Sequence, residues 1–258
     1  MSWRFLNSGA GPASHNMQRD EELALALVRG DGVPTLRVYA WKPWAISIGW
    51  NQSFDEIAME RVEADGIDMI RRPTGGRAVF HARELTYSVV MDANGRSVAD
   101  LYRLISEGLV CAVRKLGVDA SMESRVIDVP AAGRARTAAC FAATTRSEIV
   151  VGMKKLVGSA QRRYGAPGKQ DVVLQHGSLL LSSEHARIVE YLQLPRNRRE
   201  ILRQELLNRS TDVSAALGRP ASFAEAVVAV REGFEEAWGI SFQETPGILL
   251  EREHETAT

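Results

Sequence analysis

The sequence is nearly free of cysteine and contains only Cys111 and Cys140. These two residues have no CxxC spacing and no accompanying His/Cys pattern, which excludes a disulfide scaffold and gives no sign of a structural metal site. We therefore expect a protein without a bound metal, located in a reducing compartment and most simply in the cytoplasm.

The sequence also lacks long hydrophobic runs and any excess of charge. No stretch of about 18 uncharged apolar residues occurs, so no transmembrane helix is predicted. The first thirty residues carry charges throughout, which argues against a signal peptide. Lys and Arg together number 32, as do Asp and Glu, and the zero formal charge argues against nucleic-acid or membrane partners.

What is present is an ordinary globular composition, with 45% hydrophobic and 25% charged residues over 258 positions. We expect one domain over residues 1–258, without an accessory domain. The hydrophobic patterns predict helices over residues 14–30, 54–67, 97–117 and much of 184–238. They predict strands over residues 34–41, 45–50, 68–73, 78–81, 84–92, 150–165 and 171–183.

The order of these predicted elements favours a mixed α/β fold over a regular βαβ winding. There is no GxGxxG after a strand and no GxxxxGK[ST], so neither a Rossmann nor a P-loop nucleotide site is predicted.

The segment RRPTGGRAVFH, from Arg71 to His81, is the first candidate for a site. Its two adjacent glycines let the backbone approach a ligand closely, and the flanking arginines and the histidine add hydrogen-bond donors. This combination suits an anionic or carbonyl-bearing ligand. A β-hairpin turn with solvated arginines explains the same pattern.

The segment VGMKKLVGSAQ is the second candidate, because it pairs two of the scarce lysines, Lys154 and Lys155. Neighbouring residues of a strand face opposite ways, so only one of these lysines can point inward. An inward lysine is costly unless it meets an anion or a polarised carbonyl. The alternative is a strand end with both amines in water.

Cys140 is the third candidate. It follows a polar loop that contains Arg134 and Arg136, and a thiol near cationic groups ionises more easily and becomes nucleophilic. Cys111 lies in a predicted apolar helix face, where a cysteine usually serves as a small hydrophobic packing residue.

Taken together, these segments resemble the biotin/lipoate A/B protein ligase family. The segment RRPTGGRAVFH followed by ELTYSV is similar to one signature of that family, and KKLVGSAQRR followed by VVLQHGSLLL is similar to another. The resemblance implies a class II biotin/lipoate ligase-like fold, in which helices flank a mixed β-sheet and a smaller second sheet is present.

Within that family, Cys140 followed by a lysine strand is similar to the octanoyltransferases that work through a cysteine thioester. The resemblance implies that Cys140 accepts the acyl group and that Lys155 contacts the acyl carbonyl, with Lys154 facing solvent. The residues implied to line the acyl channel are Arg72, Gly75, Gly76, Ala78, His81, Gly158, Ser159, Ala160, His176, Gly177 and Ser178.

The resemblance also implies the reaction and its partners. Octanoyl-acyl carrier protein donates the acyl group, and a lysine of a lipoyl domain receives it, as in glycine cleavage H protein or a 2-oxoacid dehydrogenase E2. No ATP is needed, because the thioester already carries the activation. The base that takes the proton of the acceptor amine stays open among Lys155, His81 and His176.

Two departures from the family pattern bear on the alternatives. Arg77 stands where lipoate ligases usually have a third glycine, and Ala82 follows His81 where the family often has Asp. An ATP-dependent lipoate ligase, or an amidotransferase between lipoyl proteins, is the second hypothesis. A non-enzymatic acyl-binding protein is the third, although mere binding needs neither Cys140 nor Lys155.

Acyl carrier proteins are acidic, so a basic docking face is expected. Arg162 and Arg163 are the favoured candidates, ahead of the arginines between Arg196 and Arg203. The loop at residues 131–135 is rich in glycine, alanine and arginine and is predicted to be mobile, and the sequence leaves open whether it closes when the donor binds.

Overall fold

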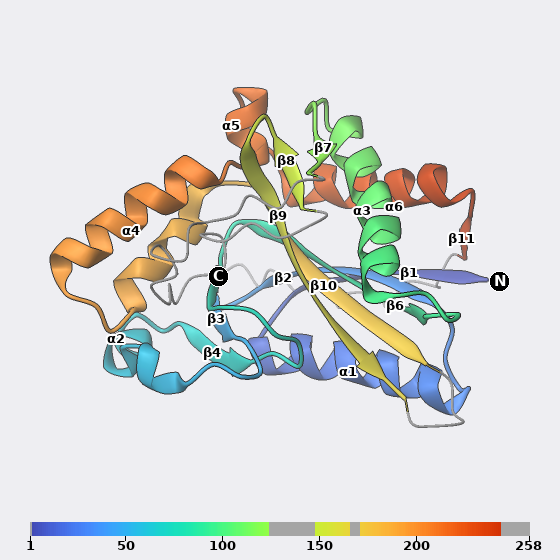
Figure 1. Cartoon of the computed structure of the whole chain (residues 1–258), viewed down its shortest axis with the longest axis horizontal. Helices are drawn as coiled ribbons and strands as arrows, with labels where there is room; N and C mark the ends of the chain where they lie inside the picture. Colours follow the sequence, from blue (N-terminus) through green and yellow to red (C-terminus); the bar gives the residue numbers. More distant parts are fainter. Residues whose placement is uncertain (1, 124–147, 166–170, 244–258) are drawn as a thin grey trace, which may run out of the picture.

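The computed structural model describes residues 2–123, 148–165 and 171–243. Within these ranges the chain forms a large mixed sheet and a small second sheet, with helices packed around them (Figure 1). The predicted mixed α/β class with a smaller second sheet is confirmed. No helix in the described ranges is long and apolar enough to cross a membrane.

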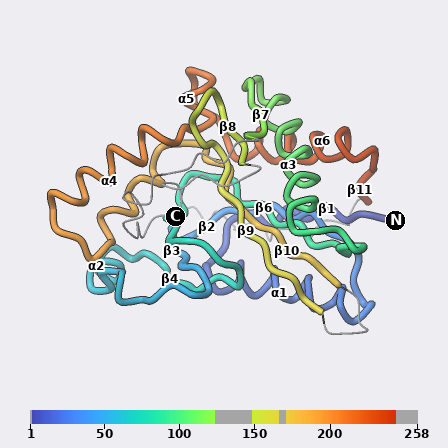
Figure 2. The backbone as a smooth tube through the Cα atoms, in the orientation of Figure 1, coloured from blue at the N-terminus to red at the C-terminus, as the bar shows by residue number. Residues whose placement is uncertain are grey.

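The large sheet has the strand order β11-β1-β2-β6-β10-β9-β8-β7. β11, β1 and β2 are parallel, and every pairing from β2 to β7 is antiparallel. The long strands β9 and β10 lie side by side across the middle of the molecule (Figure 2). The strands are β1 (Trp3–Gly11), β2 (Thr35–Trp41), β6 (Glu84–Asp92), β7 (Ser121–Met122), β8 (Ile149–Val151), β9 (Lys154–Tyr164), β10 (Val172–Leu180) and β11 (Phe242–Gln243).

The small sheet has the order β4-β3-β5, with β3 (Ala45–Ile48) at its centre. β4 (Asp68–Arg71) runs parallel to β3, and β5 (Val79–His81) runs antiparallel to it. The connection from β4 to β5 carries the two adjacent glycines of the first motif. This connection therefore leaves the small sheet and approaches the large one.

Helices cover both faces of the large sheet. α1 (Ala13–Arg29) packs on one face, and α3 (Val98–Lys115) and α6 (Phe223–Trp238) pack on the other (Figure 1). Ser97 caps α3, and Ser222 forms a capping box at the start of α6, which satisfies free amides of the first turn. The remaining helices are η1 (Phe54–Glu56), α2 (Met59–Ala64), η4 (Ser183–Tyr191), α4 (Arg196–Arg209) and α5 (Val213–Leu217).

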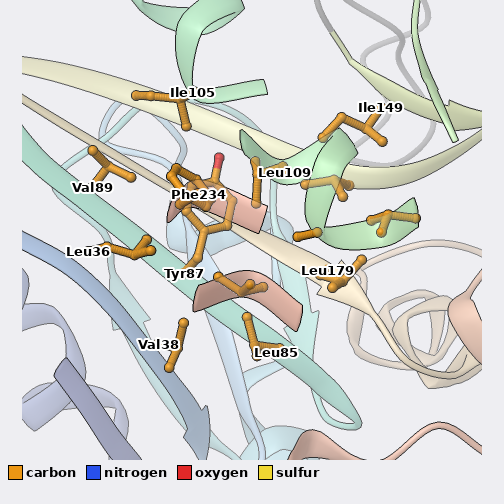
Figure 3. Close-up of a cluster of buried hydrophobic side chains, with 14 of the residues drawn as sticks. Leu36, Val38, Leu85, Tyr87, Val89, Ile105, Leu109, Ile149, Leu179 and Phe234 are labelled. Atoms are coloured by element: carbon orange, nitrogen blue, oxygen red, sulfur yellow. The ribbon is translucent and has the colours of Figure 1, made fainter. Parts of the chain in front are cut away.

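The largest core cluster lies between the large sheet and the pair α3/α6. Leu36 and Val38 of β2 point into it together with Tyr87 of β6, and Phe234 of α6 packs among them (Figure 3). The residue between the two β2 side chains, Arg37, faces α1 instead, because side chains alternate along a strand. The face of the sheet toward α1 is thus the polar one, and the site described below is built on it.

Two predicted elements differ from the structure, and one long strand was missed. The predicted strand over residues 150–165 is a hairpin, in which Gly152 has a φ of 61° between β8 and β9. The predicted helix over residues 54–67 is divided into η1 and α2. β1 was not predicted at all, because its polar residues mask the alternation of a half-buried parallel strand.

The prediction that Cys111 is a buried packing residue is wrong. The residue is half-buried and lines a surface groove beside Lys115 and Glu236. Burial and the hydrogen bond with Glu236 raise the pKa of its thiol. The apolar sequence neighbours of Cys111 do face the core, but the side chain itself lies at the seam that α3 forms with α6.

Candidate active site

A cavity lies where the small sheet meets β6, β9 and β10 of the large sheet, with an empty volume of about 480 Å³ including its open mouth. The predicted site residues that line it are Arg72, Gly76, His81, Gly158, Ser159, Ala160, His176, Gly177 and Ser178. The other lining residues are Met17, Tyr39, Trp41, Ser47, Val79 and Thr86. The fold thus brings the two signature motifs, which are far apart in the sequence, to one cavity.

The wall from the large sheet depends on a close approach of two strands. Ser159 of β9 is paired with Gly177 of β10. A Cβ atom added to Gly177 would lie 2.3 Å from the carbonyl oxygen of Gly158, which is closer than real contacts allow. Glycine is therefore required at position 177, and the backbone of both strands forms the cavity surface there.

The opposite wall is held by the buried guanidinium of Arg72. It donates to the carbonyl oxygen of Gly75 at 2.8 and 3.1 Å, and to that of Arg77 at 2.8 Å. It also donates to the carbonyl and the hydroxyl of Ser47, at 3.0 and 3.1 Å. Arg72 thereby fixes the glycine turn against β3, and Gly76 takes the left-handed φ of 100° that the turn requires.

His81 is held in one orientation between a carboxylate and a hydroxyl. Its Nδ1 lies 2.7 Å from Glu84 Oε1, and its Nε2 lies 2.8 Å from Ser47 Oγ. Trp41 stacks on the imidazole with ring centroids 4.1 Å apart. Because a carboxylate only accepts, Nδ1 donates to Glu84, and the Ser47 hydroxyl lies within hydrogen-bonding distance of Nε2.

Glu84 is buried, and three side chains donate to its Oε1. They are those of His81, Thr86 and Ser178, at 2.6 to 2.7 Å. Burial alone would raise the pKa of Glu84, but the charge interaction with His81 and these hydrogen bonds outweigh it and lower the pKa. The cavity is therefore underlain by an ionised carboxylate that fixes three of its lining side chains.

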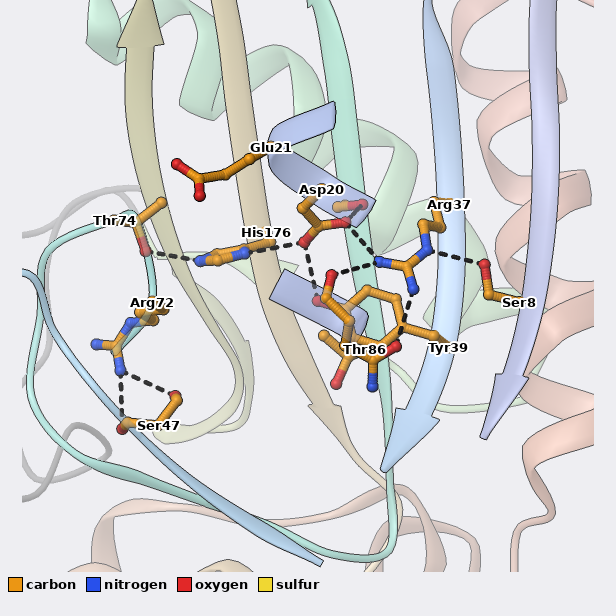
Figure 4. A network of polar contacts seen from close by, with 12 residues as sticks. Ser8, Asp20, Glu21, Arg37, Tyr39, Ser47, Arg72, Thr74, Thr86 and His176 are labelled. Carbon is orange, nitrogen blue, oxygen red and sulfur yellow. Dashed lines mark hydrogen bonds and ion pairs between the residues drawn. The ribbon is translucent and has the colours of Figure 1, made fainter. Parts of the chain in front are cut away.

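His176 is held by a second arrangement of the same kind (Figure 4). Its Nδ1 lies 3.2 Å from Asp20 Oδ2, and its Nε2 lies 2.6 Å from the hydroxyl of Thr74. Burial lowers the pKa of His176, and the hydrogen bond and charge of Asp20 only partly offset that effect. The neutral ring donates from Nδ1 to Asp20 and accepts at Nε2 from Thr74.

Asp20 is the centre of a fully buried polar network on the α1 face of the sheet. Arg37 Nη1 donates to it at 2.7 Å, and the hydroxyls of Tyr39 and Ser88 donate at 2.9 and 2.7 Å. Burial would raise the pKa of Asp20, but the His176 hydrogen bond and the Arg37 charge lower it below its ordinary value. The carboxylate is thus ionised and anchors His176 to α1 and β2.

Lys155 is buried with 3% of its surface exposed, whereas Lys154 is exposed. The prediction that only one of these two lysines points inward is confirmed. The Lys155 ammonium lies 2.6 Å from Glu148 Oε1, and Glu148 directly precedes β8. Lys155 is not among the described residues that line the cavity, but it lies on β9 only three residues before Gly158.

Two further predicted residues lie beside the cavity rather than on its described lining. Gly75 is exposed and contributes its carbonyl oxygen to Arg72. Ala78 is buried in the apolar cluster below the small sheet, together with Phe80 and Tyr191. These placements give Gly75 a role in the turn and Ala78 a role in packing. Cys140 and the loop at residues 131–135 lie outside the described residues.

The sequence prediction missed the carboxylates that support the site. Asn16 and Asp20 are spaced i, i+4 on the buried face of α1, among Met17, Leu23 and Leu27. Two polar residues at that spacing on an apolar helix face are the signal that points to a buried polar network. Glu84, the first residue of a strand in which eight consecutive residues are buried, is a second such signal.

The two predicted docking arginines have different surroundings. Arg162 lies over the rings of Trp50 and Tyr164 at 4.9 and 4.8 Å and donates to the Pro73 carbonyl at 3.2 Å. Arg163 instead forms an ion pair with Asp171. Arg162, beside the exposed Trp50 and the glycine turn, is therefore the better placed of the two for a partner that approaches the cavity.

The fold and the cavity define a mixed α/β domain with a cavity between its two sheets. Residues 12–235 match the family described as the lipoyl protein ligase A/B catalytic domain. The chain belongs to this family, and the resemblance inferred from the motifs is confirmed.

Relatives of nearly full length carry the name octanoyltransferase LipM. That from Kyrpidia tusciae is 42% identical over 99% of this chain and 93% of its own length. That from Symbiobacterium thermophilum is 41% identical with the same coverage. The prediction of an acyltransferase of this family is confirmed, and octanoyl transfer is the activity that the relatives' names state.

Solved structures of lipoate ligases share the fold. A lipoate-protein ligase A bound with ATP matches with a TM-score of 0.72 and 25% identity, over 95% of this chain and 89% of that one. A bipartite lipoate protein ligase from Thermoplasma acidophilum matches with a TM-score of 0.74 and 23% identity, over 95% and 87% of the two chains.

Proposed function

We propose that this enzyme moves an octanoyl group from octanoyl-acyl carrier protein to the target lysine of a lipoyl domain, through a thioester on Cys140. The observation that carries the proposal is the convergence of the glycine turn and the strands β9 and β10 on one cavity, with the buried Lys155 just before it on β9. This arrangement suits an acyl chain that lies in the cavity with its carbonyl toward Lys155.

The first half-reaction is a thioester exchange. The thiolate of Cys140 attacks the octanoyl carbonyl, and the oxyanion of the tetrahedral intermediate accepts a hydrogen bond from the Lys155 ammonium. The C–S bond to pantetheine then breaks, and pantetheine leaves as a thiolate that takes up the proton that the Cys140 thiol released on ionising. A preorganised donor to such an oxyanion contributes on the order of 3 kcal/mol to the rate. The result is an octanoyl-enzyme and free carrier protein.

The second half-reaction forms the amide. The neutral amine of the acceptor lysine attacks the Cys140 thioester, a C–N bond forms, and the C–S bond breaks to release the cysteine thiolate. The amine loses one proton in this step, which a base must take up. Covalent catalysis thereby divides one difficult transfer into two easier ones.

The proposal includes neither ATP nor a metal as cofactor, because a thioester donor is already activated. It places the reaction in a reducing compartment, the cytoplasm, where a catalytic thiolate stays unoxidised. The proposed partners are octanoyl-acyl carrier protein and lipoyl proteins such as glycine cleavage H protein or a 2-oxoacid dehydrogenase E2. The name octanoyltransferase of the full-length relatives supports the acyl group.

Intact-mass measurement tests the thioester. The protein is mixed with octanoyl-acyl carrier protein without ATP, beside the variants Cys140→Ala and Cys111→Ala. We expect one octanoyl group on the wild type and on Cys111→Ala, none on Cys140→Ala, and release by hydroxylamine or by an apo lipoyl domain. The Cys111 variant is the matched control, because this half-buried thiol lies in the groove beside Glu236, away from the cavity.

The second candidate function is an ATP-dependent lipoate ligase, which is favoured by the likeness to a solved ligase structure bound with ATP. In that case no adduct would form with carrier protein, and lipoyl-domain modification would require free acid and ATP. Acyl transfer from a modified lipoyl protein, without carrier protein, would instead identify an amidotransferase.

A further inference from the structure

The pair formed by Lys155 and Glu148 stands out because both members are nearly inaccessible. Lys155 is 3% exposed and Glu148 is 8% exposed, and the Nζ–Oε1 distance is 2.6 Å. Lys155 lies on β9, and Glu148 directly precedes β8, the strand that pairs with β9 in this hairpin through Val150 and Lys155. The pair is therefore set by strand pairing and not by two flexible surface side chains.

A buried ion pair of this kind is weak as a stabilising device. Removing two charges from water offsets much of their attraction, and a well-packed apolar pair is often as stable. Breaking such a pair by removing one partner, however, leaves the other charge buried and unpaired. The pair therefore points to a requirement for the Lys155 charge at this position rather than to stability.

The backbone around Lys155 is fixed from a second direction. Its carbonyl oxygen accepts from the amide of Thr211 at 2.9 Å, in the connection between α4 and α5. Next to it, the hydroxyl of Ser210 bonds to Nε2 of His185 at 2.7 Å. Both the main chain and the ammonium of Lys155 are thus anchored, and only the chain of methylenes between them can adjust.

We propose that Glu148 is the positioning residue of Lys155. Its carboxylate holds the ammonium near one place, so that Lys155 donates a hydrogen bond to the acyl oxyanion. Because an ammonium carries three N–H donors, its bond to Glu148 is compatible with donation to an acyl oxygen. This inference rests on the proposed octanoyl transfer and deepens it.

The same arrangement decides the role of Lys155 in the second half-reaction. A lysine whose ammonium forms an ion pair with a buried carboxylate is placed to donate hydrogen bonds, and we assign it no role as a general base. The proton of the acceptor amine then goes to a group other than Lys155. The titratable groups around this strand end are Glu148 before β8, His185 on η4 and Asp212 at the start of α5, and Lys154 faces away to solvent.

The test is a pH–rate comparison of Glu148→Gln with the wild type and with Lys154→Gln, under saturating octanoyl-acyl carrier protein. Gln keeps the size of the side chain but removes the negative charge beside the buried ammonium, which disfavours the charged form of that amine. We expect kcat to fall about 10²-fold, the effect expected of a misplaced catalytic group. We also expect KM to change little and the alkaline limb of the profile to move to lower pH.

The conservative variant Glu148→Asp is expected to restore the position of the alkaline limb in part, since it keeps the charge. Lys154→Gln, which removes a lysine charge from the same hairpin, is expected to keep the wild-type profile. Thermal unfolding of each variant separates a folding defect from a catalytic one, because a loss of folded protein lowers the rate equally at every pH.

An unchanged pH–rate profile in a folded Glu148→Gln protein would overturn the inference. A shift of its alkaline limb to higher pH would overturn it as well. Failure of the proposed octanoyl transfer can be distinguished from failure of the inference about Glu148, because the transfer is tested on the wild-type protein alone. A wild type that takes no octanoyl group from carrier protein refutes the transfer, whereas a wild type that does, beside an unchanged Glu148→Gln, refutes only the role of Glu148.

Discussion

The hydroxyl of Thr74 and Nε2 of His176 lie 2.6 Å apart, although 102 residues separate them in the sequence. Thr74 belongs to the turn that follows β4 in the small sheet, and His176 is on β10 of the large sheet. This hydrogen bond is the direct link between the glycine turn and the strand that form opposite walls of the cavity. Through Asp20, the same link reaches α1.

The variant Thr74→Val tests the contribution of this bond. Valine keeps the shape of threonine but leaves Nε2 of a buried histidine without its donor, which costs about 1–3 kcal/mol. We expect a loss of that size in the free energy of unfolding, measured with urea, and a raised KM for the acyl donor. Ser183→Ala, at an exposed hydroxyl, is the control. A Thr74→Val protein as stable as that control would contradict the link.

The stability of the protein is expected to decline as the pH falls below neutrality. Burial holds the pKa of His176 below its ordinary value of 6.5, so the unfolded chain gains a proton at that pH before the folded chain does. Stability is therefore full above about pH 6.5 and falls until the folded pKa is reached. Burial lowers the pKa of His185 too, which adds to the decline in the same direction.

Urea unfolding at several pH values between 8 and 5.5 measures how the free energy of unfolding changes with pH. In His176→Gln we expect the free energy of unfolding to change less steeply with pH, because only His185 and other groups then contribute to the pH dependence. A slope identical to that of the wild type would show that His176 does not titrate differently in the two states. The variant's lower stability at pH 8 is a separate effect, since glutamine cannot reproduce both imidazole contacts.

Removal of the Arg37 charge is expected to destabilise the fold strongly. Arg37 and Asp20 form an ion pair of 2.7 Å in which both side chains are fully buried. Arg37→Met leaves the Asp20 carboxylate without its cation, and breaking a buried pair in this way costs about 3–5 kcal/mol. Urea unfolding measures the loss.

Arg19→Met is the matched control for this experiment. Arg19 pairs with Glu22 at 3.2 Å on the exposed face of α1, the helix that carries Asp20. Exposed ion pairs of this kind contribute less than about 1 kcal/mol to stability. Equal losses in the two variants would mean that the buried network is not a stabilising unit.

Lys155→Gln is expected to lower kcat by about 10²–10³-fold, the cost of removing one oxyanion donor. Lys154→Gln is expected to stay within roughly twofold of the wild type, as for a surface substitution. Steady-state transfer to an apo lipoyl domain measures both. Similar losses in the two variants would point to the charge of the hairpin as a whole, and not to the buried amine.

Gly177→Ala is expected to destabilise the protein by about 1–3 kcal/mol, as overpacking typically does. The added methyl group would lie 2.3 Å from the Gly158 carbonyl oxygen, so β9 and β10 would have to move apart at the cavity wall. Gly75→Ala is the control, because nothing lies within 4 Å of its added Cβ. Thermal unfolding compares the two, and a neutral Gly177→Ala would mean that the strands can separate without cost.

The amphipathic helices were predictable from local patterns alone. α1, α3 and α6 carry a strong helical period, and Gly30 and Gly239 end two of them in the left-handed conformation. β1 was not predictable, because a short parallel strand is stabilised by β2 and β11 rather than by its own residue preferences. The break at Gly152 was also missed, since one glycine in an apolar run is compatible with either a strand or a turn.

The sequence by itself determined the family, through two long motifs, and with it the residues expected at the cavity. Strand alternation, a local property, also limited the inward-facing lysines to at most one of the adjacent pair, although the pattern by itself was equally compatible with both amines in water. The tertiary structure alone decided the partners of these residues. Glu148 for Lys155, Asp20 for His176 and Glu84 for His81 are pairings that no local pattern specifies. Each depends on how strands and helices pack, and burial makes these hydrogen-bonded pairs stronger than they would be in water.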